Sequence, residues 1–363
     1  MVVHQAYRYE LDPAASQRVL LAKHAGTARF AFNWGLALCK ERLEHHESVP
    51  HGAELHRLWN VFKREGAPWW VEVSKCSPQE SLRDLDRAFG NFWRGREAGR
   101  PVGFPRFKKK GVHDGFRLTG SIHVESRQIV LPRLGAIRTK EATNKFQGRI
   151  LSASISHEAD RWYVSLTVER ERPDPAPVAG PVVGVDLGIS SFAMLSDGSA
   201  LQSPRALERS LRRLQRASKA HSRKRKGSRN RRKSALRLAR LHRRIRNRRQ
   251  DFLHKATTAL AKTKSVIAVE DLCVRGMVRN RHLARHIADA GWSEFRRLLA
   301  YKTVWCGSQL VVAPRFFASS KTCSACGMEI DRDLNAALNL AKVAGSSPET
   351  LNACGGRVRP ALA

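Results

Sequence analysis

Three acidic residues stand at the ends of apolar segments in a chain that is otherwise rich in arginine and lysine. Asp186 and Glu270 each close a short apolar run, Val-Val-Gly-Val-Asp and Val-Ile-Ala-Val-Glu, and Asp333 precedes a Leu-Asn-Ala-Ala-Leu-Asn run with helical spacing. Short apolar runs of this kind predict buried strands. Carboxylates placed at such ends can bind the divalent cations that assist phosphodiester cleavage.

Each acid also has an ordinary structural interpretation. A single aspartate at a strand end is usually a turn residue, and Asp333 could simply cap its helix. Taken together, an Asp on a first strand, a Glu on a later strand and an Asp on a helix follow the order of a ribonuclease H-like fold. Acids that converge at one sheet edge repel unless cations neutralise them. We therefore expect two divalent ions, with oxygen ligands favouring Mg²⁺ or Mn²⁺ over zinc.

One cysteine pair has metal-ligand spacing. Cys323 and Cys326 form a C-x-x-C motif, whereas the other cysteines have no paired spacing. Half of a tetrahedral site cannot hold a structural zinc ion, although Cys306 or a histidine could complete it in three dimensions. We expect zinc to be absent. The sequence has 7 cysteines in all, too few for a disulfide framework, which favours a reducing cytoplasm.

The charge balance points to a polyanionic partner. The chain of 363 residues has 66 Lys and Arg against 32 Asp and Glu, a net charge of +34, and the natural counter-charge is nucleic acid. Its 42% hydrophobic content is enough for a sizeable core. We see neither an apolar run of about 18 residues nor a secretion signal. A cytoplasmic, nucleoid-associated prokaryotic protein is expected, with two or three domains or one domain with large insertions.

Much of the surplus lies between residues 205 and 249, where 21 Lys and Arg accompany one acid. Leucines recur there at helical spacing, and Gly227 and Ser228 could form a turn, so we expect two basic helices that face phosphates. The expected nucleic-acid contacts are Arg212, Arg213, Arg223, Arg225, Arg231, Arg232, Arg243 and Arg244. A disordered basic arm or plain helix packing would give the same pattern.

A Gly- and Pro-rich loop at residues 99–111 interleaves cations with Phe104 and Phe107. Such alternation suits phosphate contact combined with base stacking. The expected contacts are Arg106, Lys108, Lys109 and Lys110. An ordinary surface loop could have the same composition.

The remaining pattern gives the elements that position these groups. Residues 1–15 predict a first strand, 16–112 a helical region, and 113–178 a small antiparallel barrel or sheet. Prolines between 173 and 181 mark the clearest domain boundary. Beyond it we expect an α/β domain at 179–345 with a basic helical insertion at 205–262, then a disordered tail at 346–363.

The three acidic motifs resemble those of a RuvC nuclease domain. They read Gly184-Val-Asp-Leu-Gly, Val269-Glu-Asp-Leu and Asp331-Arg-Asp-Leu-Asn-Ala-Ala-Leu-Asn. Two further segments, Asn280-Arg-His-Leu-Ala-Arg-His and Arg315-Phe-Phe-Ala-Ser-Ser-Lys-Thr-Cys, resemble the TnpB family, the transposon-encoded RNA-guided nucleases ancestral to type V CRISPR effectors. The resemblance covers nearly the whole chain.

The resemblance implies an RNA-guided DNA endonuclease that acts as a monomer. A guide RNA from the transposon end would pair with double-stranded target DNA beside a short target-adjacent motif and form an R-loop. Asp186, Glu270 and Asp333 would be the catalytic, metal-binding acids of RuvC chemistry, with Asp331 as the alternative third acid.

The resemblance also implies a multidomain α/β plus α+β fold. An N-terminal β-barrel wedge domain and a helical recognition lobe would precede the ribonuclease H-like RuvC domain. The family usually carries a second C-x-x-C pair, so residues 317–329 would be a truncated zinc-ribbon-like segment.

Three other functions fit part of the pattern. An RNA-guided repressor would bind target DNA without cutting it. A transposase would also use three acids but would need no guide RNA. A packaging protein would need the positive charge but no acids at strand ends.

Overall fold

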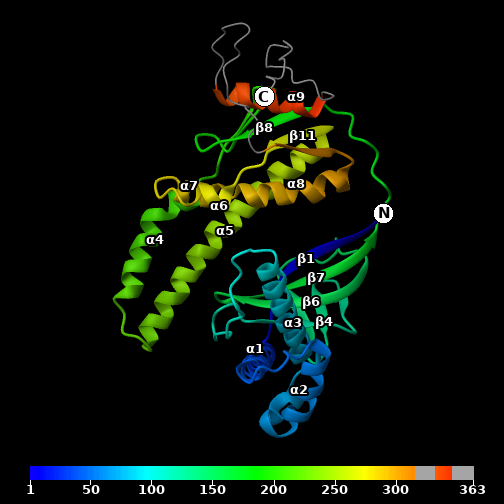
Figure 1. The fold of residues 1–363 in the computed structure, drawn as a ribbon, viewed down its shortest axis with the longest axis vertical. Coiled ribbons are helices and arrows are strands. Elements are labelled where there is room, and N and C mark those ends of the chain that lie inside the picture. Colours follow the sequence, from blue (N-terminus) through cyan, green and yellow to red (C-terminus); the bar gives the residue numbers. More distant parts are fainter. Residues whose placement is uncertain (315–331, 346–363) are drawn as a thin grey trace. The chain divides into compact units, whose positions relative to one another are not determined.

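The computed structural model describes residues 1–314 and 332–345 and divides the chain into two compact units, Met1–Arg172 and Pro173–Ala363 (Figure 1). The expectations for Asp331, for Cys323 and Cys326 within the segment 317–329, and for the tail 346–363 lie outside the described residues. The two units are described separately.

Unit 1 is built on a seven-stranded antiparallel sheet with the order β2-β6-β7-β1-β5-β4-β3. Its strands are β1 (Val2–Asp12), β2 (Gly115–Leu118), β3 (His123–Glu125), β4 (Gln128–Leu131), β5 (Gly135–Thr139), β6 (Arg149–Glu158) and β7 (Arg161–Glu171). Alternation is clear in β7, where Trp162, Val164 and Leu166 are buried and the residues between them are half-buried. Within the described strands no pairing joins β2 to β3, so of the two alternatives that the sequence left open, barrel or sheet, the hydrogen bonding shows an open sheet.

The helices of unit 1 lie in the chain between β1 and β2. They are α1 (Ala15–Glu44), α2 (Gly52–Gly66), the short 3₁₀ helix η1 (Pro68–Glu72) and α3 (Cys76–Glu97). Leu36, Trp59 and Leu82 belong to the core that joins α1, α2 and α3. Pro13 precedes the N-cap residue Ala14 and so lies just before α1.

Unit 2 contains a five-stranded mixed sheet with the order β10-β9-β8-β11-β12. The strands are β8 (Val183–Leu187), β9 (Ala193–Leu195), β10 (Ala200–Leu201), β11 (Val266–Glu270) and β12 (Gln309–Ala313). β8, β11 and β12 are parallel, and β9 returns antiparallel beside β8. The chain crosses between the parallel strands through helices, as parallel pairing requires.

The helices of unit 2 are α4 (Ala206–Ser222), α5 (Arg229–Thr263), α6 (Val274–Met277), α7 (Ala284–Ala290), α8 (Trp292–Cys306) and α9 (Arg332–Gly345). One face of the sheet packs Val185 and Val269 into a core with α5 and α8, which includes Leu253 and Phe295. Ala268 lies on the opposite face, in a small cluster with Leu340 of α9. Side chains alternate along a strand, so Gly184 and Ala268 put small residues where α9 must fit.

The basic segment is ordered as two helices. α4 and the first half of α5 run side by side and extend away from the sheet (Figure 1). The turn at residues 223–228 ends on Ser228, whose hydroxyl caps α5 by accepting from the Arg231 amide at 3.1 Å. Leu241 and Ile245 are buried on α5, so part of the apolar stripe serves helix packing. Among the described helices, none has the length and hydropathy needed to cross a membrane.

Candidate active site and nucleic-acid interface

The register of the parallel strands brings two acids to one edge of the sheet. Val185 of β8 pairs with Val269 of β11, and the next residues along the two strands are Asp186 and Glu270. Asp186 shares the face of Gly184, and Glu270 shares the face of Ala268, because side chains alternate. Both acids therefore stand on the α9 face at the carboxyl ends of neighbouring strands, and both are half-buried.

Helix α9 brings the third acid to the same edge. A Cβ on Gly184 would lie 1.8 Å from the Ala337 carbonyl oxygen and 2.5 Å from the Ala341 nitrogen, so the α9 backbone rests directly on β8. Asp333, in the first turn of α9, has Oδ2 3.8 Å from the position of a Cβ on Gly188, just past the end of β8. The three acids expected from the sequence thus share one edge and one face.

Their donor chemistry fits hard divalent cations, since all three offer only carboxylate oxygens. In the structure, however, the three carboxylates are not grouped closely enough to form a metal-binding cluster. Within residues 1–314 and 332–345, no three His, Cys, Asp or Glu side chains lie close enough together to hold a metal ion. Asp186, Glu270 and Asp333 therefore lie on a common edge without forming a complete ligand cluster.

The acid next to Glu270 has a different role. Asp271 forms an ion pair with Arg296 of α8, which ties the end of β11 to that helix. The sequence could not show that Asp271, and not Glu270, contacts Arg296. The alternation of β11 and the Asp271–Arg296 pair together favour Glu270 as the acid of the edge.

The cations of the basic hairpin, α4 with α5, differ in exposure. Most of the expected contacts are exposed, namely Arg212, Arg213, Arg223, Arg225, Arg232 and Arg244, and the half-buried ones are Arg231 and Arg243. The Arg231 guanidinium donates to the carbonyl oxygens of Lys224 at 2.8 Å and His221 at 3.2 Å. Its contacts close the turn of the hairpin, a structural role that the charge pattern did not reveal.

The Phe104–His113 loop of unit 1 frames a cavity of about 1040 Å³ with Lys40 of α1, a size typical of ligand sites. Asn33 holds the loop from both sides: its side-chain oxygen accepts from the Lys108 amide at 2.8 Å, and its amide donates to the Lys108 carbonyl at 3.0 Å. Phe107 is 46% exposed, and the Lys40 ammonium lies 4.9 Å from its ring centroid. Sequence analysis did not identify Lys40 and Asn33 as part of this site, because both lie in α1, far along the chain from the loop.

Not all expected cations of this loop are equally available. Arg106, Lys108, Lys109 and Lys110 are all exposed as residues, but the Lys108 ammonium has a contact of its own. The Lys108 ammonium lies 4.0 Å from the centroid of Phe32, and desolvation there lowers the pKa of Lys108. Lys108 therefore contributes to packing of the loop as well as to its charge.

Comparisons with known proteins agree with the sequence resemblance. Three family models match: "Probable transposase" over residues 165–281, "Helix-turn-helix domain" over 1–48 and "Cas12f1-like, TNB domain" over 292–340. The structure of residues 1–48 contains a strand and one long helix, β1 and α1.

Curated relatives match along most of the chain. A Mycobacterium tuberculosis (strain CDC 1551 / Oshkosh) protein named "Putative RNA-guided DNA endonuclease" is 38% identical over 93% of this chain and 86% of its own length. InsQ of Escherichia coli (strain K12), with the same description, is 35% identical over 89% of this chain and 83% of its own. The chain belongs to the TnpB family.

Two further matches also cover most of the chain of this TnpB family member. A Streptomyces pristinaespiralis protein with the same description is 34% identical and covers 99% of this chain and 92% of its own length. A solved structure titled "Cryo-EM structure of the Cas12f1-sgRNA-target DNA complex" aligns over 94% of this chain and 99% of its own, with 11% identity and a TM-score of 0.46.

Proposed function

We propose that this TnpB family protein is a transposon-associated, RNA-guided DNA endonuclease that cuts its target at the edge formed by Asp186, Glu270 and Asp333. The observation that supports the proposal is that these acids lie along one sheet edge, on the α9 face of β8 and β11. Relatives described as RNA-guided DNA endonucleases match along 83% or more of their length. An acidic edge in a protein of net charge +34 is best explained by chemistry on the polyanion that the charge attracts.

The three carboxylates would hold two Mg²⁺ or Mn²⁺ ions. Bound there, such ions would supply an activated water and stabilise the oxygen that leaves when the phosphodiester breaks. The protein's own contribution is positional: β8 and β11 fix two acids by register, and α9 fixes the third by resting on Gly184. The sheet with its flanking helices is our candidate for a ribonuclease H-like RuvC domain.

The nucleic-acid contacts would be divided between the two units. The exposed arginines of α4 and α5 are our candidates for binding the guide RNA and its duplex with target DNA, recognised through phosphates and not through bases. The cavity at Phe107 is our candidate for contact near the target-adjacent motif. The sheet and helices of unit 1 would then act as wedge domain and recognition lobe of a monomeric, cytoplasmic, nucleoid-associated enzyme.

Guided cleavage tests the catalytic part of the proposal. The protein is purified with its RNA, and target cleavage in Mg²⁺ is compared between the wild type and Asp186→Ala. Asp197→Ala serves as a control, because Asp197 is an exposed acid of unit 2 that pairs with Lys264 at 2.8 Å. We expect cleavage by the wild type and the control, and none by Asp186→Ala. Equal cleavage by the wild type and Asp186→Ala would reject the edge as the nuclease site.

A guided repressor is the second candidate. It needs the exposed arginines of α4 and α5 but no cutting at the acidic edge. Tight guided binding of target DNA with no cutting in Mg²⁺ or Mn²⁺ would establish it. A transposase would instead copurify without a discrete RNA.

A further inference from the structure

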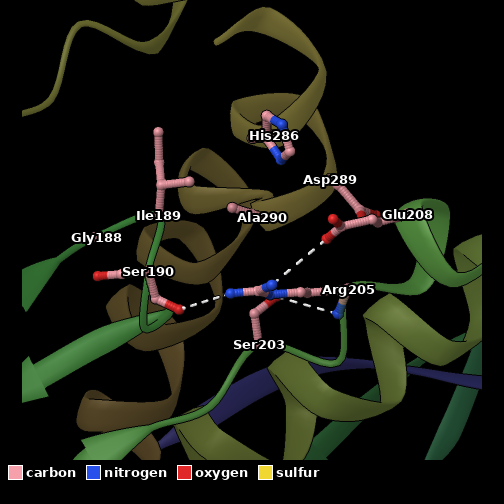
Figure 2. A pocket seen from close by; sticks show the side chains of 9 residues that line it. All are labelled: Gly188, Ile189, Ser190, Ser203, Arg205, Glu208, His286, Asp289 and Ala290. Carbon is pink, nitrogen blue, oxygen red and sulfur yellow. Dashed lines mark hydrogen bonds and ion pairs between the residues drawn. The ribbon is translucent and has the colours of Figure 1, made fainter.

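A pocket of about 290 Å³ adjoins the acidic edge within unit 2 (Figure 2). Its walls come from the loop after β8, the residues just before α4, the first turn of α4, and α7. Gly188, just past the end of β8, lines this pocket, and a Cβ built on it would lie 3.8 Å from Asp333 Oδ2. The pocket therefore begins where the acidic edge ends, and a strand held at the acids could continue into it.

Arg205 supplies the pocket with a positioned cation. Its Nη2 donates to the Ser190 carbonyl oxygen at 3.1 Å, and its Nη1 lies 3.8 Å from a Glu208 carboxylate oxygen. Figure 2 shows the guanidinium extended between these two residues, with His286 on the far side of the pocket. A guanidinium has five N–H donors, so these two contacts leave donors for a bound anion. The side chain remains 51% exposed.

The two acids that line the pocket, Asp289 and Glu208, differ in whether they pair with Arg205. Asp289 is engaged elsewhere: its two oxygens accept from the Leu207 amide at 2.9 and 3.1 Å, and it lies 4.0 Å from Arg249. Glu208 is exposed and within ion-pair distance of Arg205 alone among the described contacts. An arriving anion can therefore replace Glu208 at Arg205 without disturbing Asp289.

We propose that this pocket binds a backbone phosphate of the DNA strand being cut, with Arg205 as its ligand and Glu208 as the group that the phosphate displaces. The proposal rests on the nuclease function above. The planar fork of arginine matches phosphate oxygens, and contacts to phosphates fix the register of a strand. Arg205 would thus hold the scissile phosphodiester in line with the acids, since small misplacement of a reacting bond slows catalysis strongly.

The test measures single-turnover cleavage by the guided complex on targets that carry one neutral methylphosphonate at each position around the cut. Arg205 has φ +43°, a left-handed conformation that asparagine tolerates, so Arg205→Asn is the preferred variant. Arg205→Lys keeps the charge but loses the fork. Arg149→Ala removes one exposed cation from unit 1 as a matched control.

We expect Arg205→Asn to cut at least tenfold more slowly than the wild type, and Arg205→Lys to be intermediate. Target binding without divalent ions should change less than twofold, because base pairing holds the target. One methylphosphonate beside the cut should slow the wild type as much as Arg205→Asn does, and should slow that variant no further. Arg149→Ala should match the wild type, and Glu208→Gln should cut at least as fast as it.

Two results would overturn the subsite. One is cleavage by Arg205→Asn at the wild-type rate. The other is that every methylphosphonate slows the wild type and Arg205→Asn by the same factor. If Arg205→Asn does not fold, the Arg205→Lys comparison decides in the same way. A wild type that cuts no target would reject the nuclease function itself, which separates the failure of that function from the failure of this subsite.

Discussion

At the scale of single residues, Gly184 is important because it has no Cβ, which lets α9 approach β8 closely. The α9 backbone occupies the space that a Cβ there would need, at 1.8 and 2.5 Å. Gly184→Ala should therefore push α9, and Asp333 with it, away from β8. We expect a loss of about 1–3 kcal/mol in the free energy of unfolding and strongly reduced target cleavage. Urea unfolding and the guided cleavage assay measure the two effects.

Gly90→Ala is the matched control for this substitution. Gly90 lies in α3, and a Cβ there would meet nothing within 4 Å. Alanine is the better helix former, so this variant should be slightly more stable and should cut normally. Full cleavage by Gly184→Ala would show that α9 does not position the third acid.

His24 should make unit 1 sensitive to acid. Its ring is fully buried, with Nδ1 donating to the Leu20 carbonyl at 2.8 Å and Nε2 accepting from the Ser74 amide at 3.0 Å. Burial lowers the pKa of His24 below its ordinary value of 6.5, so the unfolded chain binds the proton more tightly. The contribution of His24 to the free energy of unfolding should therefore be fully present above pH 6.5, and it should fall as the pH drops below that value.

Urea unfolding of the full chain between pH 7.5 and pH 5 checks this. His24→Gln should be less stable than the wild type at pH 7.5 but should lose less stability on acidification. A residual slope is expected, because burial also lowers the pKa of His56 and of His157 in the same unit. Parallel slopes for the two proteins would contradict the role of His24.

At the scale of elements, a buried lysine joins α8 to α5. Lys302 is 8% exposed, and its ammonium donates to the His254 carbonyl and to the hydroxyls of Thr257 and Thr258, at 2.7 to 2.8 Å. Lys302→Met should cost about 1.5–3 kcal/mol of unfolding free energy, since the hydrogen bonds of a charged donor are lost. Lys262→Met, at an exposed position of α5, should cost far less. Equal thermal stability of the two variants would exclude this link.

The elements also show how far sequence could lead. The apolar runs predicted β8 and β11 together with the acids near their carboxyl ends, because a buried strand with a carboxylate near its end is a local pattern. The periodic leucines and Gly227 likewise predicted the α4–α5 hairpin. The contacts of Arg231, Asn33 and Arg205 could not be predicted, since each depends on a carbonyl or loop brought close by folding.

At the scale of the whole molecule, the positive charge and the scarce acids have different tasks. The net charge of +34 is concentrated between residues 205 and 249, where 21 of the 66 Lys and Arg lie, and it explains which class of partner is held. It gives no base specificity, because phosphate contacts are the same in every sequence. Specificity must therefore come from the paired RNA, and under the proposed function the acidic edge would cut the bound DNA.

Exchange of the guide sequence tests this account most directly. The protein is loaded with RNAs that share one scaffold but differ in the guide segment, and each complex is offered two DNA targets in Mg²⁺. We predict that each guide directs cutting to its own target only, and that Asp186→Ala abolishes cutting while target binding persists. Cutting that ignores the guide, or that persists in Asp186→Ala, would contradict the central claim.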